Sequence, residues 1–299
     1  AVRFILESTS NAAEAADPSK TRARSGPLCM LRRLFGLASN VSPRSRMASH
    51  VAPEGVAAAP LADDLNADLS MRVLMRTSTM AFVSSGQTAT VERKRCFRAG
   101  DQERGAVTSV VRYLPGAAFP AHPHPQGEEI YVLEGIFSDA RGDHGAGTLL
   151  LNPEGWEHAP HSAEGNTILV RLRQYPSADA ETPRAQLAVD AVALAWADGA
   201  PGVSTKLLYP LDAAQAAAYP ERQWLEKWAA GAAPVSARVS AGGHEVFVVE
   251  GGFSDSDGDY AKGDWLRLPA GHAYAPTPGE DGCTLLCKSG GLVHAIPAC

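Results

Sequence analysis

From about Thr79 onward, hydrophobic residues occur in short runs rich in Val, Leu, Tyr and Phe, and each run ends at Gly, Pro, Asp or Asn. Runs of this kind predict β-strands, and their regular spacing is typical of a β-sandwich or barrel. The predicted strands are Val107–Leu114, Glu129–Leu133, Thr148–Leu151, Thr167–Arg173, Val203–Tyr209, Glu245–Val249, Trp265–Leu268 and Thr284–Lys288. A helical pattern is confined to Leu211–Tyr219 and Gln223–Ala230, so we expect an all-β fold.

An internal repeat divides this β-rich region into two similar halves. Glu129–Pro160 aligns without a gap with Glu245–Pro276, and an EG pair, an FSD triplet and several Gly and Pro residues recur at matching positions. A repeat of this length indicates one structural unit used twice. We therefore predict two tandem domains, residues 71–180 and residues 181–299, joined by the Pro- and Ala-rich stretch Ser177–Val189.

The N-terminal residues 1–70 have a different composition. No acidic residue occurs between Asp17 and Glu54, whereas Lys and Arg are spread among Ser and Ala. This composition is typical of a disordered segment and also of an organelle transit peptide. We expect a disordered or transit-like extension, and we predict a cytoplasmic protein, or a chloroplast or mitochondrial one if the extension is a transit peptide.

Composition narrows the function classes. The 299 residues carry 27 basic and 33 acidic side chains, a formal net charge of −6, which does not favour a nucleic-acid partner. No run of 18 apolar residues occurs, so no membrane association is predicted. The five cysteines form neither paired CxxC motifs nor an even-numbered disulfide framework, which indicates a reducing compartment.

The first half contains two spaced strings of chemistry-bearing residues. They read G-x5-H-x-H-x3-E-x6-G and G-x5-P-x-G-x2-H, and comprise Gly116, His122, His124, Glu128 and Gly135, then Gly147, Pro153, Gly155 and His158. His122 and His124 leave the same face of a strand, about 7 Å apart along the chain. Glu128 follows a turn, and His158 follows a second one. Imidazole and carboxylate suit first-row divalent metals, so we predict a metal site of His122, His124, Glu128 and His158.

Neighbouring residues offer alternatives to this ligand set. Glu129 could replace Glu128, but Gly135 fits the motif spacing when it is counted from Glu128. His161 is expected at the rim of the site, and His144 is expected to be solvated in a turn. No catalytic residue is assigned.

The second half lacks the same ligands. The counterparts of His122, His124, Glu128 and His158 are Arg238, Ser240, His244 and Tyr274. Arginine cannot ligate a cation. We therefore expect one divalent metal ion per chain and a degenerate, structural second domain.

The two strings resemble the paired motifs of the cupin superfamily, with Ser162 where the second motif usually ends in Asn. Among the cupins, the stretch from Gly127 to Pro160 is similar to the cupin domain of ChrR anti-sigma factors. The resemblance covers residues 105–175 and, more weakly, residues 235–290. The resemblance implies two small antiparallel β-barrels of the double-stranded β-helix type, and it places the family's three His and one Glu on the four predicted ligands. Ala140, Arg141 and His144 depart from the family pattern in a turn.

The resemblance implies two functions of different classes. Similar cupins include non-haem iron dioxygenases that cleave small carbonyl or enolate substrates, whereas the ChrR likeness implies a non-catalytic, zinc-bearing sensor or ligand-binding module. A bicupin decarboxylase of the oxalate type would require ligands in both halves. Fe2+, Zn2+, Mn2+ and Ni2+ all accept this ligand set. The expected partner is a small-molecule substrate or ligand, and a homodimer is a possible assembly.

Overall fold

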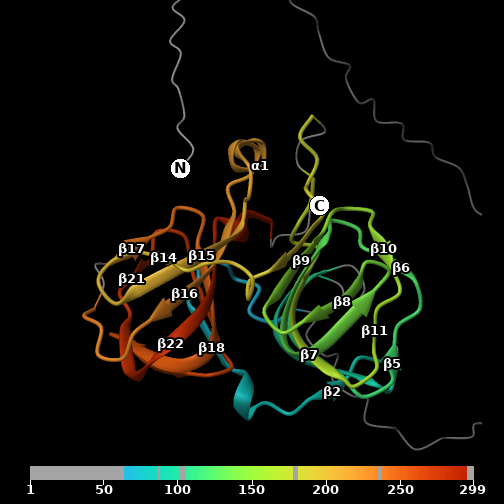
Figure 1. Cartoon of the computed structure of the whole chain (residues 1–299), viewed down its shortest axis with the longest axis horizontal. Helices are drawn as coiled ribbons and strands as arrows, with labels where there is room; N and C mark the ends of the chain where they lie inside the picture. The colour runs from blue at the N-terminus through green and yellow to red at the C-terminus, as the bar shows by residue number, and fades with distance from the viewer. Residues whose placement is uncertain (1–63, 87, 101–104, 178–180, 235–236, 295–299) are drawn as a thin grey trace, which may run out of the picture. The chain divides into compact units, whose positions relative to one another are not determined.

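The computed structural model describes residues 64–86, 88–100, 105–177, 181–234 and 237–294. Nearly all regular structure in these ranges is antiparallel β-sheet, arranged as two barrels of matching topology that lie side by side (Figure 1). This confirms the predicted all-β, two-domain fold. Most of the predicted N-terminal extension, residues 1–63, lies outside the described residues. No helix among the described residues is long and apolar enough to cross a membrane.

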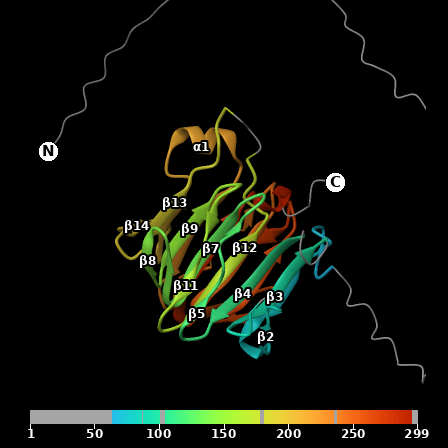
Figure 2. The ribbon, with the colours of Figure 1, turned by 90° about the vertical axis from the view of Figure 1, so that its right-hand side faces the viewer.

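The first barrel is built around one large sheet with the order β13-β9-β7-β12-β4-β3-β2 (Figure 2). Its strands are β2 (Val83–Ser84), β3 (Val91–Ala99), β4 (Ala106–Tyr113), β7 (Glu128–Asp139), β9 (Thr148–Asn152), β12 (Asn166–Leu172) and β13 (Leu187–Asp190). Shorter strands close the barrel: β5 (Ala117–Ala118), β6 (His122–Pro123), β8 (Gly142–Gly145), β10 (Glu157–His158) and β11 (His161–Ser162).

The second barrel follows the same plan, with the order β1-β20-β18-β22-β16-β15-β14. Its strands are β1 (Val73–Arg76), β14 (Ala197–Asp198), β15 (Val203–Tyr209), β16 (Arg222–Trp228), β17 (Arg238–Val239), β18 (His244–Asp255), β19 (Gly258–Ala261), β20 (Asp264–Leu268), β21 (Ala273–Tyr274) and β22 (Thr277–Ser289). The remaining elements are α1 (Ala213–Ala218), η1 (Thr77–Thr79) and η2 (Gly291–His294).

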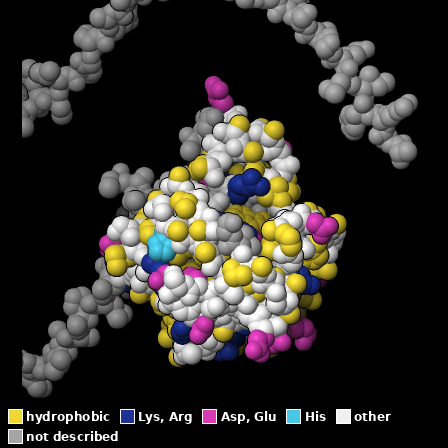
Figure 3. All heavy atoms as spheres, turned by 90° about the vertical axis from the view of Figure 1, so that its left-hand side faces the viewer, with side chains coloured by type: hydrophobic (Ala, Val, Ile, Leu, Met, Phe, Trp, Pro, Cys, Tyr) yellow, Lys and Arg dark blue, Asp and Glu magenta, His cyan; other side chains and the backbone are white. Residues whose placement is uncertain are grey.

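On the face that Figure 3 shows, acidic and basic side chains are scattered among hydrophobic and polar ones.

The barrels exchange their first strands. Strand β1, which begins the first repeat, pairs with β20 of the second barrel, and β13, which begins the second repeat, pairs with β9 of the first. Each sheet is therefore completed by a strand from the other repeat. The boundary along the chain does not separate two independent barrels.

The central strands are buried on both faces. Ile130 and Val132 of β7 pack inside the first barrel, whereas Tyr131 between them packs against residues of the second barrel such as Phe247 and Trp265. Successive side chains of a strand point to opposite faces. The unbroken apolar run in β7 thus supplies the barrel core and the contact between the barrels.

One predicted helix is wrong. The expected helix within Leu211–Tyr219 forms, as α1, where the side chain of Asp212 accepts a hydrogen bond from the backbone N of Gln215 at 2.8 Å. The expected helix Gln223–Ala230 is instead strand β16. Leu225 of β16 packs between the barrels, whereas Trp228 packs inside the second barrel. Because both faces of this strand are buried, its apolar residues do not alternate, and their spacing resembles that of a helix.

Candidate metal site

Three histidines of the first barrel come together from two paired segments. His122 of β6 lies directly opposite His158 of β10 in the antiparallel register. His124 follows β6, and its backbone N donates to Trp156 O at 2.8 Å, which connects the segment that carries His124 to the turn before β10. The site therefore depends on a pairing between segments far apart in the chain.

A tight turn brings in the carboxylate. Gln126 and Gly127 both have positive φ, at 58° and 73°, and the chain then enters β7 at Glu128. A side chain at position 127 would collide with the backbone of Tyr175, so glycine is required there. Alternation along β7 then turns Glu128 towards the barrel interior.

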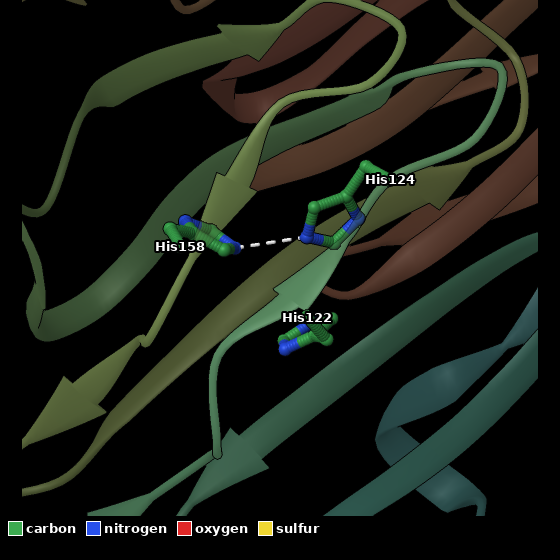
Figure 4. A group of neighbouring side chains, drawn as sticks. All are labelled: His122, His124 and His158. Carbon is green, nitrogen blue, oxygen red and sulfur yellow. Dashed lines mark hydrogen bonds between the residues drawn. The ribbon is translucent and has the colours of Figure 1, made fainter.

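The donor atoms converge on one point (Figure 4). The ring nitrogens of His122, His124 and His158 all lie within 4.8 Å of one another, and His124 Nε2 is 3.0 Å from His158 Nε2. Glu128 Oε2 lies 3.5 Å from His124 Nε2 and 3.4 Å from His158 Nε2. Two ligands about 2.1 Å from one ion, at octahedral or tetrahedral angles, are roughly 3.0–3.4 Å apart. The spacing of His124, His158 and Glu128 therefore fits a single divalent ion, and His122 lies close enough to join them.

Hydrogen bonds outside the cluster orient its members. His122 Nδ1 donates to Pro120 O at 2.7 Å, and His158 Nδ1 lies 3.3 Å from Asp139 Oδ2. Asn152 Nδ2 donates to Glu128 Oε2 at 2.8 Å. Because Nδ1 of two histidines is engaged in this way, Nε2 of each is left to face the cluster, as in the outer partners of protein metal sites.

Asp139 is the centre of a network that the sequence did not indicate. Besides His158, it accepts hydrogen bonds from Arg141 Nη2 at 2.6 Å and from His144 Nε2 at 3.3 Å. Burial alone would raise its pKa, but hydrogen bonds from His158 and Arg141 hold the pKa well below the usual range. The expectation that His144 is solvated is wrong, because its ring is buried against Asp139.

The surroundings of His124 favour its neutral form. The pKa of His124 is lowered to about 4, mainly by burial; the Glu128 carboxylate opposes this shift, and the neighbouring rings of His158 and His122 add to it. Neutral imidazole is the form that binds metal. His161, expected at the rim, is exposed on β11.

An apolar cavity of about 370 Å³ adjoins the cluster inside the first barrel. Its lining includes His122, His124 and Glu128 together with Phe137, Ile168 and Val170. This volume is at the small end of the range for small-molecule pockets.

Glu129 lies on the opposite face of β7 from Glu128. It is buried between the barrels, where its Oε1 lies 2.6 Å from Lys288 Nζ and its Oε2 lies 3.5 Å from Arg171 Nη1. Glu129, the alternative to Glu128 as a metal ligand, is thus paired with basic side chains away from the histidine cluster.

The corresponding place in the second barrel is filled differently. Arg238 Nη1 pairs with Glu226 Oε2 at 2.6 Å, and the ring of His244 lies between Trp224 and Tyr274, with centroids 5.5 and 5.4 Å away. A protein cation thus lies where the first barrel has His122.

The fold and the histidine cluster together define a two-barrel cupin. A family model described as the ChrR cupin-like domain matches residues 70–176 and 184–293, and the chain belongs to this family. No curated protein matches the sequence.

Solved structures with the same fold are distant in sequence. A proposed dioxygenase from Nostoc punctiforme is 16% identical, with a TM-score of 0.58 over 73% of this chain and 82% of the other. The Escherichia coli protein Ylba is 13% identical, with a TM-score of 0.60 over 74% and 92%. A point mutant of the oxalate decarboxylase OxdC of Bacillus subtilis is 14% identical, with a TM-score of 0.51 over 73% and 76%. At these identities the likeness concerns the fold.

Proposed function

We propose that this bicupin is a mononuclear, metal-dependent enzyme, a non-haem dioxygenase or a related activity on a small carbonyl or enolate substrate. The observation that carries the proposal is the convergence of three histidines and one carboxylate beside a cavity that His122, His124 and Glu128 line together with many apolar side chains. His122, His124, Glu128 and His158 would hold one divalent ion, with Fe2+ the first choice and Zn2+, Mn2+ or Ni2+ also acceptable.

The charge of the site suits an electron-rich ligand. Three neutral imidazoles and one carboxylate leave a bound divalent ion with net positive charge, so the ion would act as a Lewis acid towards an enolate or carbonyl oxygen. The chain's own residues supply orientation and water exclusion. Asn152 fixes Glu128, Asp139 fixes the ring of His158, and Phe137 and Ile168 keep the cavity apolar.

A non-catalytic zinc module is the second candidate. The separations of 3.4 and 3.5 Å between Glu128 Oε2 and the two imidazoles match tetrahedral angles, which structural zinc sites use with all four positions filled by protein. The family description also names the ChrR cupin-like domain.

Metal analysis tests the ligand set. Protein purified anaerobically should contain about one divalent ion per chain, and Glu128→Gln should lower the metal content strongly because it removes the only anionic ligand. Glu157→Gln is a matched control, since Glu157 is exposed beside His158. Glu129→Gln should also retain metal. Two ions per chain, or equal loss in all three variants, would overturn the assignment.

A second measurement separates enzyme from module. If the site is catalytic, the iron-loaded protein should bind nitric oxide, give a half-integer-spin EPR signal, and consume oxygen with members of a panel of diketones, aryl ketones and oxo acids. A closed four-ligand zinc site has no free position for nitric oxide. Absence of both the signal and oxygen uptake from fully iron-loaded protein would favour the zinc module.

A further inference from the structure

Tyr113 lines the cavity beside the histidine cluster, but the metal site does not use it. It is the last residue of β4, where it pairs with Val91 of β3. Val91 lines the same cavity, and so does Val111, two positions before Tyr113 on β4. Because residues two apart on a strand share a face, Tyr113 lies on the inner face of the first barrel.

Two aromatic side chains connect Tyr113 to the histidine cluster. The ring centroid of Tyr113 lies 6.4 Å from that of Phe119 and 6.0 Å from that of Phe137. Phe119 in turn lies 5.4 Å from the ring of His122, and Phe137 lies 6.1 Å from the ring of His158. Both phenylalanines line the cavity. Tyr113 is thus one side chain away from the histidine cluster, a separation that a small ligand in the cavity can span.

The hydroxyl of Tyr113 makes no hydrogen bond to any described residue. Two other buried tyrosines differ in this respect. Tyr175 Oη donates to Ala185 O at 3.0 Å, and Tyr209 Oη donates to Gln215 Oε1 at 3.1 Å. A buried phenol ordinarily has a hydrogen-bond partner. A ligand of the cavity can supply this partner to Tyr113.

The phenol of Tyr113 is a neutral donor at physiological pH. Burial, followed by the Glu128 carboxylate, raises the pKa of Tyr113 above its ordinary value, so the hydroxyl keeps its proton. A protonated phenol donates one hydrogen bond to a ligand oxygen. A ligand without an oxygen at this place leaves a buried donor unpaired and is therefore disfavoured.

We propose that Tyr113 orients the ligand of this cavity and selects it, by donating a hydrogen bond to an oxygen at the end of the ligand remote from the histidine cluster. The ligand is then a small carbonyl compound with oxygen atoms at both ends and an apolar body between them. Ile168 and Val170, which line the cavity, contact that body. The inference rests on the proposed function for the end of the ligand that faces the histidines.

Ligand-observed NMR titration of the full zinc-loaded chain tests this inference with 1,4-cyclohexanedione and cyclohexanone. The two compounds share one ring, but the dione has a second carbonyl where the ketone has a methylene group. Relative to the ketone, the dione should bind about 3- to 10-fold more weakly to Tyr113→Phe than to the unmodified chain, as expected for one neutral hydrogen bond. Tyr131→Phe is the control, because Tyr131 packs against the second barrel. Circular dichroism checks that each variant is folded.

Infrared spectra of the bound dione give a readout that a merely structural role would not move. Tyr113→Phe should shift one carbonyl band to higher frequency, because a hydrogen bond to that carbonyl oxygen is lost. Tyr131→Phe should leave both carbonyl bands in place.

The outcomes distinguish this inference from the proposed function. If the chain binds no metal, but Tyr113→Phe still weakens the dione and shifts its carbonyl band, the proposed function fails and the role of Tyr113 stands. If zinc binds, but Tyr113→Phe behaves like Tyr131→Phe or weakens both compounds equally, the role of Tyr113 is overturned. Failure of both compounds to bind also overturns it.

Discussion

Replacing Lys288 by Met removes one charge from a group of charged side chains that lie buried between the two barrels. Lys288 pairs with Glu129 at 2.6 Å, and the equivalent pair from the other repeat joins Arg171 to Glu245 at 2.7 Å. All four side chains are at most 6% exposed. In the Lys288→Met variant, the Glu129 carboxylate would keep only Arg171, whose Nη1 lies 3.5 Å away.

The expected cost follows from this burial. Removing one partner of a buried pair leaves a desolvated charge and costs about 3–5 kcal/mol, whereas an exposed pair contributes at most about 1 kcal/mol. Lys262→Met is the matched control, because Lys262 pairs with Glu250 at 2.8 Å but the two side chains are 55% and 63% exposed. In a domain of this size, about 3–5 kcal/mol corresponds to a fall in Tm of roughly 6–20 °C.

Thermal and urea unfolding, each followed by circular dichroism, measure the difference. Lys288→Met should lower the free energy of unfolding several-fold more than Lys262→Met. Adding Glu129→Gln to Lys288→Met should recover part of the loss, because the uncompensated carboxylate is then gone. Equal effects of the two lysine variants, or a double variant whose loss is the sum of the single ones, would refute the reasoning.

His244→Phe should flatten the acid side of the stability curve, because burial lowers the pKa of His244 to about 4 from 6.5. Between pH 6.5 and pH 4, His244 is protonated in the unfolded chain but stays neutral in the folded one, so the free energy of unfolding falls as the pH falls. Urea unfolding at about pH 7 and at about pH 4.5 should therefore show a smaller loss of stability in the variant. Asp139→Asn should weaken zinc binding about 10- to 100-fold in a chelator competition, whereas unchanged affinity would show that the contact with His158 has no effect on the metal. After Cys29 and Cys299 are replaced by Ser, a thiol reagent should react only with the unfolded chain, because burial raises the pKa of the remaining thiols, Cys96, Cys283 and Cys287.

Local spacing was sufficient to predict much of the candidate site. The H-x-H string, the turn after it and the start of β7 lie within a few residues, so strand alternation alone turns Glu128 inward and Glu129 outward. His158 could be placed because the repeat and the second string fix the next hairpin. The structure brings these four side chains together, and their role as metal ligands stays a prediction.

Other parts depend on contacts that no local pattern contains. Strand β3 carries several charged residues, including Arg93, and so was not recognised as a strand. The hydrogen bonds of Asp139 to His144 and His158 join three separate strands. Strands β1 and β13 pair with β20 and β9, which occupy equivalent edges of the two sheets. The sequence of neither strand specifies which of these two edges it joins.

Strands β7 and β18 are equivalent in the two repeats, and the face on which a residue lies explains whether both repeats have the same residue there. Glu129 and Glu245 recur because each pairs across the boundary with a base of the other repeat, so a change in one half would leave a buried charge in the other. Glu128 and His244 face separate interiors and do not constrain each other. The second barrel can therefore hold an Arg238–Glu226 pair at the place that matches His122 without any change to the contact between the barrels.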